Sequence, residues 1–181
     1  IKAANSQPFS HVHNPGISVG GHCIPVYPKF YLSTHPEAKL PSTSIEINES
    51  MPKRAVLALF DSYGTIEGKK IAILGAAYRS GVKETAFSGV FPLVNEITNH
   101  GGIAVVHDPL YTSDELSQMG LVSFELGENC DAAIVHTDHK IYANLTPTDL
   151  LGAEIIYDGR RIVNQDKLHP IPVKTIGVGE N

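Results

Sequence analysis

The chain has 181 residues, of which 42% are hydrophobic and 18% are charged; this balance is typical of a globular protein and excludes global disorder. The chain has fourteen Lys and Arg and nineteen Asp and Glu, which gives a formal net charge of -5. Because the sequence has no basic stripe, nucleic acid is not an expected partner. The two cysteines are too few for a disulfide framework, and with neither a secretory leader nor a membrane-spanning apolar run we expect a cytoplasmic protein without a membrane partner.

Residues 1–42 are expected to form a loop-dominated arm. They are rich in Pro, Gly, His and Ser, and prolines at positions 8, 15, 25, 28, 36 and 41 interrupt any regular period. The chain starts at Ile1 within the segment IKAANSQPF and has no initiator Met there. We therefore expect a piece of a longer protein.

Residues 43–64 are expected to form a helix. Ser44 can cap it, apolar residues recur at helical spacing, and Gly64 can end it. The helix has more apolar side chains than are needed to cover one sheet. The surplus indicates a homodimer. The apolar residues concerned are Ile45, Ile47, Val56, Leu57 and Leu59.

From residue 65 onward the pattern predicts a doubly wound α/β fold. Short apolar runs rich in β-branched residues occur at 69–76, 102–109, 130–138, 153–159 and 174–179, and helical segments occur at 88–101 and 113–120. Such alternation is typical of a parallel sheet with helices on both faces, which binds ligands beyond the carboxyl ends of its strands. The first strand is followed by GAAYRSG instead of GxGxxG, so the sheet is not expected to hold a pyrophosphate as a dinucleotide fold does.

The segment PGISVGGHCIPVYPKFYL contains the residues best suited to take part in a reaction. Gly20 and Gly21 allow close approach of the backbone to a ligand, and they lead His22 and Cys23 into a turn that prolines stiffen. These residues alone leave two alternatives open for Cys23, a nucleophilic thiolate or a small buried thiol. Cys130 precedes an apolar strand and is expected to be buried.

A metal site is not expected. His11, His13, His22 and Cys23 lie close in sequence, but adjacent residues rarely bind one ion together, and a second spaced pair is missing. A metal-dependent hydrolase built on this arm remains the weakest alternative. Among other polar residues, His136 is expected to be a hydrogen-bonded core imidazole, and Lys83 and Glu84 a solvated loop pair.

The chain resembles the UDP-sugar 6-dehydrogenases, the UDP-glucose and UDP-N-acetylmannosamine dehydrogenase family. The run GGHCIPVYP, with AANSQPF before it and SIEINESMP after it, is similar to the family's catalytic cysteine region. AILGAAYRSGVKET, AVVHDPLY, AAIVHTDHKIY and IIYDGRRIV resemble successive strands of its carboxyl-terminal domain. The resemblance implies an arm at 1–42 from the end of the central region, a central dimerisation helix at 43–64 and a Rossmann-like UDP-sugar-binding domain at 65–181. The amino-terminal domain that holds NAD is not in this sequence.

The resemblance also implies a reaction. Family members oxidise the primary alcohol of a UDP-sugar to a carboxylate with two NAD molecules, through a thiohemiacetal and a thioester on a cysteine that Cys23 matches. It implies substrate contacts from Gly20, Gly21, His22, Tyr78, Arg79 and Arg160, with Arg79 standing where the family usually has lysine. His22 is the variant associated with N-acetylated hexosamines, so UDP-N-acetylmannosamine or UDP-N-acetylglucosamine is the expected substrate. No residue of this chain is assigned to the cofactor, and the fragment alone is expected to be inactive.

Two positions depart from the family pattern. Tyr27 stands where the family more often has an Asp thought to assist the water or the thiolate, and Ala86 stands where an arginine often reaches NAD. The alternative of a different class is a stand-alone module that binds a nucleotide or a protein without catalysis. A buried, unreactive Cys23 would favour that module.

Overall fold

The structure is a computed structural model that describes residues 1–9 and 12–177. Its elements are, in chain order, η1 (Ala4–Ser6), α1 (Tyr27–Thr34), α2 (Lys39–Tyr63), β1 (Lys70–Leu74), α3 (Val90–Asn99), β2 (Ile103–His107), α4 (Ser113–Gln118), β3 (Ala132–Val135), η2 (Lys140–Asn144), β4 (Ile155–Asp158), α5 (Gln165–Leu168) and β5 (Val173–Thr175). All five predicted strands are present, and the last predicted run extends partly beyond the described residues.

The five strands form one parallel sheet in the order β2-β1-β3-β4-β5. β1 lies between β2 and β3, and Ile71 pairs with Ala104 on one side and with Ala132 on the other. The chain therefore leaves β1 in one direction to form β2 and crosses back to form β3. The gap between the carboxyl ends of β1 and β3 is the topological switch point, where sheets of this kind bind ligands.

Apolar side chains fill the space on both faces of the sheet, which confirms the doubly wound prediction. One cluster joins Ile71, Ile73 and Ile134 to residues of α2 and α3. The other joins Leu74 and Val135 to η2, α5 and the loops on that side. Each of these fully buried aliphatic side chains stabilises the fold by roughly 1.5–3 kcal/mol.

Helix α2 begins earlier than the sequence predicted. It starts at Lys39, because Pro41 lies in its first turn, where a backbone N–H has no partner inside the helix. The hydroxyl of Ser44 donates to the carbonyl of Leu40 within the helix, so Ser44 is not the cap. Gly64 ends the helix as predicted, in the left-handed conformation at φ 71°.

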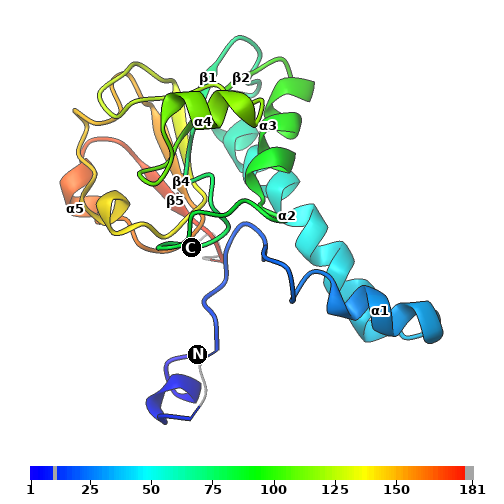
Figure 1. Cartoon of the computed structure of the whole chain (residues 1–181). Helices are drawn as coiled ribbons and strands as arrows, with labels where there is room; N and C mark the ends of the chain where they lie inside the picture. Colours follow the sequence, from blue (N-terminus) through cyan, green and yellow to red (C-terminus); the bar gives the residue numbers. More distant parts are fainter. Residues whose placement is uncertain (10–11, 178–181) are drawn as a thin grey trace.

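The arm contains a helix that the sequence did not predict. Pro25 and Pro28 suggested only a loop, but Pro28 occupies the first turn of α1, where proline is well tolerated. α1 lies beside the amino-terminal part of α2, and the two project away from the sheet (Figure 1). Within the described residues no helix combines the length and the apolar composition that crossing a bilayer requires.

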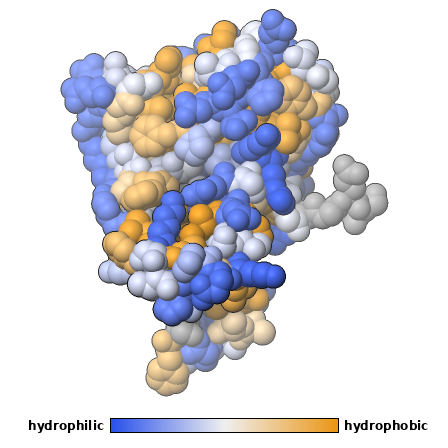
Figure 2. All heavy atoms as spheres, turned by 90° about the vertical axis from the view of Figure 1, so that its right-hand side faces the viewer, coloured by the Kyte–Doolittle hydropathy of each residue, from blue (hydrophilic) through white to orange (hydrophobic). Residues whose placement is uncertain are grey.

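The apolar residues of α2 divide between two environments. Val56 and Leu59 are fully buried in the protein's own core, so they cannot support the predicted dimer, because this part of α2 covers the sheet. Ile47 and Leu57 stay exposed. Figure 2 views the side of the molecule where α1 and α2 project and shows hydrophobic side chains gathered in its lower half. Exposed Tyr27, Phe30, Tyr31 and Leu40 belong to these two helices.

Candidate functional site

The arm crosses the carboxyl edge of the sheet in close contact with it. A side chain at Gly20 would meet the Cβ of Tyr78 at 2.6 Å and the carbonyl oxygen of Phe87 at 2.8 Å. Upstream, Ile17 is fully buried and fills the space beside Gly159. The arm therefore packs directly on the loops that follow β1 and β4, and Gly20 is required there by the close approach of two backbones.

Cys23 is exposed at the turn that follows this crossing. Its carbonyl accepts hydrogen bonds from the amides of Val26 and Tyr27, at 3.1 and 2.9 Å, where the chain enters α1. The alternative of a small buried thiol is therefore wrong for Cys23. Cys130 is 4% exposed, as predicted, and burial raises the pKa of its thiol to about 11.

Two sets of hydrogen bonds hold the turn in place. The side-chain amide of Asn48 on α2 binds both backbone groups of Val19, accepting from its N–H at 2.7 Å and donating to its carbonyl at 3.1 Å. On the sheet side, the amide of Gly21 donates to the carbonyl of Ala86 at 2.8 Å, with Gly21 at a φ of 89° that favours glycine. The cysteine turn is thus tied to α2 and to the loop after β1.

A side-chain pair reinforces the contact with that loop. Nε2 of His22 lies 2.6 Å from Oε1 of Glu84. The predicted pair of Lys83 with Glu84 is wrong, because Lys83 pairs with Glu115 on α4.

Arg160 lies at the switch point and is held there. Its guanidinium is 3.4 Å from the carboxylate of Asp138, and Asp138 also accepts the amide of Ser80 at 3.1 Å. Burial alone would raise the pKa of Asp138, but the charge of Arg160 and the Ser80 amide hold that pKa below its ordinary value. Asp138 therefore links the loops after β1, β3 and β4 and orients the arginine, against which Gly16 of the arm is packed.

The other predicted substrate residues flank this point. The ring of Tyr78 is half-buried and lies 3.1 Å from where a Cβ of Gly21 would stand. Arg79, the next residue, is exposed. The structure thus gathers Gly20, Gly21, Tyr78 and Arg160 at one edge, with His22, Cys23 and Arg79 at its rim. Tyr27 and Ala86, the two positions that depart from the family pattern, lie close to the cysteine turn in the chain or in space. Tyr27 is exposed on α1, and the carbonyl of Ala86 accepts the amide of Gly21.

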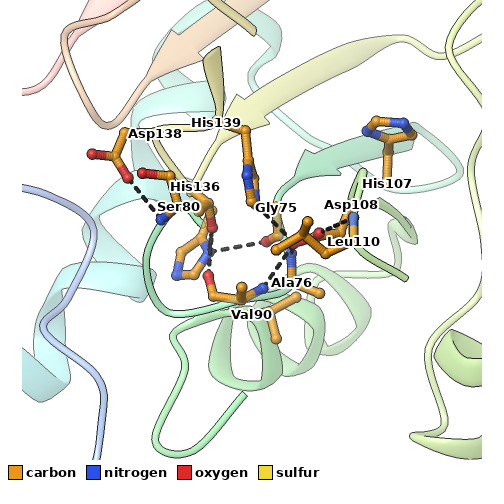
Figure 3. Close-up of polar contacts among 12 residues, drawn as sticks. Gly75, Ala76, Ser80, Val90, His107, Asp108, Leu110, His136, Asp138 and His139 are labelled. Atoms are coloured by element: carbon orange, nitrogen blue, oxygen red, sulfur yellow. Dashed lines mark hydrogen bonds and ion pairs between the residues drawn. The ribbon is translucent and has the colours of Figure 1, made fainter. Parts of the chain in front are cut away.

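The side chain of Asp108 holds the loop that follows β1 (Figure 3). Its carboxylate accepts the amides of Ala76, Ala77 and Leu110 at 2.8, 2.9 and 2.9 Å, and Nε2 of His139 at 3.2 Å. Burial alone would raise the pKa of Asp108, but these hydrogen bonds outweigh it and keep that pKa below its ordinary value. The carboxylate is therefore an anion bound by the loop.

A dinucleotide fold offers such amides to a pyrophosphate. Here Asp108 already occupies the amides of Ala76 and Ala77, so the loop does not fit a dinucleotide, in agreement with the missing glycine fingerprint. An NAD cofactor is not expected to bind on this sheet.

His136 is a buried, hydrogen-bonded imidazole, as predicted. Its Nδ1 lies 3.0 Å from the carbonyl of Gly75 and 3.0 Å from the hydroxyl of Thr137, and burial lowers its pKa to about 4. On its other side, a Cβ at Gly89 would stand 2.8 Å from Nε2 of His136 and 2.3 Å from Oγ of Ser18. Ser18 has a φ of 127°, and among the described residues its buried hydroxyl lacks a hydrogen-bond partner.

A cavity of about 570 Å³ opens beside the cysteine turn, between the arm, α2 and the start of α3. Its lining is mostly apolar and includes Ile24, Ile45, Phe87 and Phe91. In residues 1–9 and 12–177 no group of three His, Cys, Asp or Glu side chains could hold a metal ion; His11, one of the histidines considered for a metal, lies outside the described residues.

Sequence reasoning missed three residues that position this site: Asn48, Glu84 and Asp138. Each acts on a partner distant in sequence, Asn48 on Val19, Glu84 on His22, and Asp138 on Arg160. The only local signal was the place of Asp138 just after a strand.

Comparison with known proteins gives consistent matches. Residues 72–165 match the model of the UDP-glucose/GDP-mannose dehydrogenase family, UDP binding domain. A UDP-N-acetyl-D-mannosamine dehydrogenase of Methanococcus maripaludis is 30% identical over 190 residues, which cover 99% of this chain and 44% of the relative. The solved UDP-N-acetylmannosamine dehydrogenase of Pyrococcus horikoshii superposes with a TM-score of 0.77 at 30% identity, over 98% of this chain and 43% of that one.

A UDP-glucose dehydrogenase of Pyrobaculum islandicum shares the fold, with a TM-score of 0.73 at 21% identity over 88% of this chain and 38% of that one. The chain spans less than half the length of the curated relatives it matches.

Proposed function

The chain belongs to the UDP-glucose/GDP-mannose dehydrogenase family, and on that premise we propose that it is the carboxyl-terminal part of an NAD-dependent UDP-sugar 6-dehydrogenase. The family resemblance predicted from the sequence is thereby confirmed. In this proposal residues 1–42 form the catalytic arm, 43–64 the central helix and 65–181 the domain that binds the UDP-sugar.

The observation that supports the proposal best is that Cys23 is exposed two residues after Gly21, which packs on Tyr78 in the loop after β1. The arm packs on the loop after β1 and on Gly159 after β4, which are the places where a doubly wound sheet binds its ligand. A nucleotide held by the sheet would present its sugar toward the arm. The stand-alone binding module loses one line of support, because a buried Cys23 would have favoured it and Cys23 is exposed.

In this proposal Cys23 is the nucleophile. Its thiolate adds to the aldehyde carbon of the half-oxidised sugar and holds it as a thiohemiacetal, and oxidation of that adduct leaves a thioester on the sulfur. The oxidant is NAD, held by a part of the enzyme outside this chain. We infer that the 181 residues alone do not reduce NAD.

The residues around the switch point bind the substrate. Arg160, oriented by Asp138, and the exposed Arg79 supply two cations for the diphosphate. Tyr78 offers one ring face for packing against the sugar or the base, and Gly20 and Gly21 let the backbone come close.

We propose a UDP-N-acetylhexosamine as the substrate. His22 is the variant associated with such sugars in the family resemblance. The relative from Methanococcus maripaludis is named for UDP-N-acetyl-D-mannosamine, and UDP-N-acetylglucosamine remains the second substrate of this class to test.

We further propose that the enzyme is a homodimer and works in the cytoplasm. The exposed apolar residues of α1 and α2, including Phe30 and Ile47, support the dimer, because a contiguous apolar surface favours association. Both cysteines are free, as is usual in a reducing compartment. Light scattering of the chain at micromolar concentration tests the dimer.

A thermal-shift panel tests the substrate. UDP-glucose, UDP-N-acetylglucosamine and UDP-N-acetylmannosamine are added separately to the 181-residue chain. A ligand at about one hundred times its Kd stabilises the folded state by about 2.7 kcal/mol, which raises Tm by roughly 5–10 °C for a protein of this size. We expect the largest rise with an N-acetylated sugar.

Variants make the panel specific. Arg160→Ala and Arg79→Ala are expected to reduce the ligand-induced rise, and the control Arg54→Ala, exposed on α2, is expected to keep it. If no UDP-sugar raises Tm at millimolar concentration, the sheet does not bind the substrate and the proposal is refuted.

A further inference from the structure

His22 and Glu84 form a carboxylate–imidazole pair directly beside the proposed nucleophile. The two residues are 62 positions apart, and Nε2 of His22 is 2.6 Å from Oε1 of Glu84. Their side chains are 67% and 37% exposed, so the pair is open to water. His22 immediately precedes Cys23 in the chain, and successive Cα atoms lie about 3.8 Å apart.

The pair fixes the tautomer of the imidazole. A carboxylate oxygen only accepts hydrogen bonds, so Nε2 of His22 carries the proton that Glu84 receives. In the neutral ring Nδ1 then holds a lone pair. Among the described residues Nδ1 has no hydrogen-bond partner, and it is free to accept a proton from a water molecule.

Two other carboxylates near the arm are paired with cations. Glu49 on α2 is paired with Lys29 at 3.1 Å, and Asp138 is paired with Arg160. A carboxylate neutralised by a cation is a weaker base than an imidazole backed by a carboxylate. His22, the residue next to Cys23, pairs with a carboxylate and is not neutralised in this way.

We propose that His22 is the general base that releases the product from Cys23, with Glu84 as its positioning residue; this inference rests on the proposed function. Nδ1 takes a proton from a water molecule as the water oxygen attacks the thioester carbonyl carbon. The tetrahedral intermediate collapses, the C–S bond breaks, and Cys23 leaves as a thiolate. The acid product loses its remaining proton to solvent, and His22 returns its proton to the thiolate or to solvent.

Glu84 contributes in two ways. It holds the ring so that Nδ1 faces away from the loop, and its negative charge stabilises the imidazolium formed when Nδ1 is protonated. No oxidation or reduction occurs in this step, so it can be studied without a nicotinamide cofactor.

Acyl transfer from p-nitrophenyl acetate isolates this step in the 181-residue chain. Release of nitrophenolate reports acetylation of Cys23, and mass spectrometry follows the decay of acetyl-Cys23 in fresh buffer. We expect His22→Ala to lengthen the lifetime of acetyl-Cys23 at least tenfold and Glu84→Gln to lengthen it severalfold. Free imidazole is expected to restore the decay in His22→Ala. Acetylation is expected to remain in both variants and to vanish in Cys23→Ser.

The matched control is Glu49→Gln, which removes the carboxylate that α2 offers to Lys29 of the arm and is expected to leave the lifetime unchanged. An unchanged lifetime in His22→Ala would overturn the role of His22 and leave the nucleophile intact. A lengthened lifetime that imidazole does not restore would show that His22 acts only by packing, and would also overturn it. Failure of the unchanged chain to form acetyl-Cys23 would overturn the nucleophile, and the role of His22 with it.

Discussion

Replacing Asp108 by Asn tests whether this carboxylate positions the first loop of the sheet. Oδ2 accepts the amides of Ala76 and Ala77, and Oδ1 accepts the amide of Leu110. An Asn side chain has one carbonyl oxygen. Oriented toward Ala76 and Ala77, it turns its own NH2 group against the amide of Leu110 and leaves that part-buried donor without an acceptor.

The cost follows from these contacts. An unsatisfied buried donor costs about 1–3 kcal/mol, and loss of the charge weakens each remaining hydrogen bond by up to about 1 kcal/mol. We therefore expect Asp108→Asn to lower the free energy of unfolding by about 3 kcal/mol. For a chain of this length that corresponds to a decrease in Tm of roughly 6–12 °C.

Urea denaturation gives the free energy, and the UDP-sugar thermal shift gives the effect on the site. Because Ala77 precedes Tyr78 and Arg79, the ligand-induced rise in Tm is expected to shrink as well. Asp114→Asn, an exposed carboxylate in the first turn of α4, is the control and should change stability by less than about 1 kcal/mol. Equal stability of Asp108→Asn and the unchanged protein would refute the reasoning.

The pH dependence gives a second readout of the same substitution. The pKa of Asp108 is lower in the folded state than in the unfolded chain, where it is about 3.9. Its ionised form therefore stabilises the fold fully above that value, and the stabilisation is lost as pH falls through the folded pKa. Below about pH 4 the stability of the unchanged protein should fall toward that of Asp108→Asn.

Four other changes probe the arm and the core. Iodoacetamide at pH 8 should label Cys23 and spare Cys130, whose pKa of about 11 leaves about one thiol in a thousand ionised; equal labelling by mass spectrometry would contradict the structure. Ser18→Gly removes a strained φ and an unpaired hydroxyl and should raise Tm by roughly 2–4 °C. Asn48→Ala deletes two hydrogen bonds to the arm, so amide hydrogen exchange of residues 19–21 should accelerate at a stability cost of about 1–2 kcal/mol. His136, with its pKa lowered to about 4, stabilises the fold fully above its unfolded pKa of about 6.5 and less as pH falls toward 4; in His136→Gln urea stability should vary less over that range.

The strands were predictable because their signal is local. Runs such as IAIL in β1 and AAIV in β3 are buried on both faces and therefore apolar throughout. The boundaries of the helices were harder, because proline is disfavoured inside a helix but accepted in its first turn, where Pro28 and Pro41 lie. Composition alone does not distinguish these two positions.

The candidate site was predictable in part. Gly20, Gly21 and Cys23 stand out in the sequence because adjacent glycines and a cysteine in one turn are uncommon. Glu84 did not stand out, since its partner is decided by how the arm packs on the sheet. A neighbour of opposite charge, Lys83, offered a simpler pairing that tertiary contacts override.

Asp108 accepts the amides of Ala76 and Ala77, and this affects any attempt to redesign the sheet as a dinucleotide-binding site. A carboxylate attached to the same chain never diffuses away, so a soluble phosphate would compete with a partner present at very high effective concentration. Restoring glycines at positions 77 and 80 would leave that competitor in place. Redesigning the sheet to bind a dinucleotide would first require removal of Asp108. The same change would remove the hydrogen bonds that hold the loop after β1.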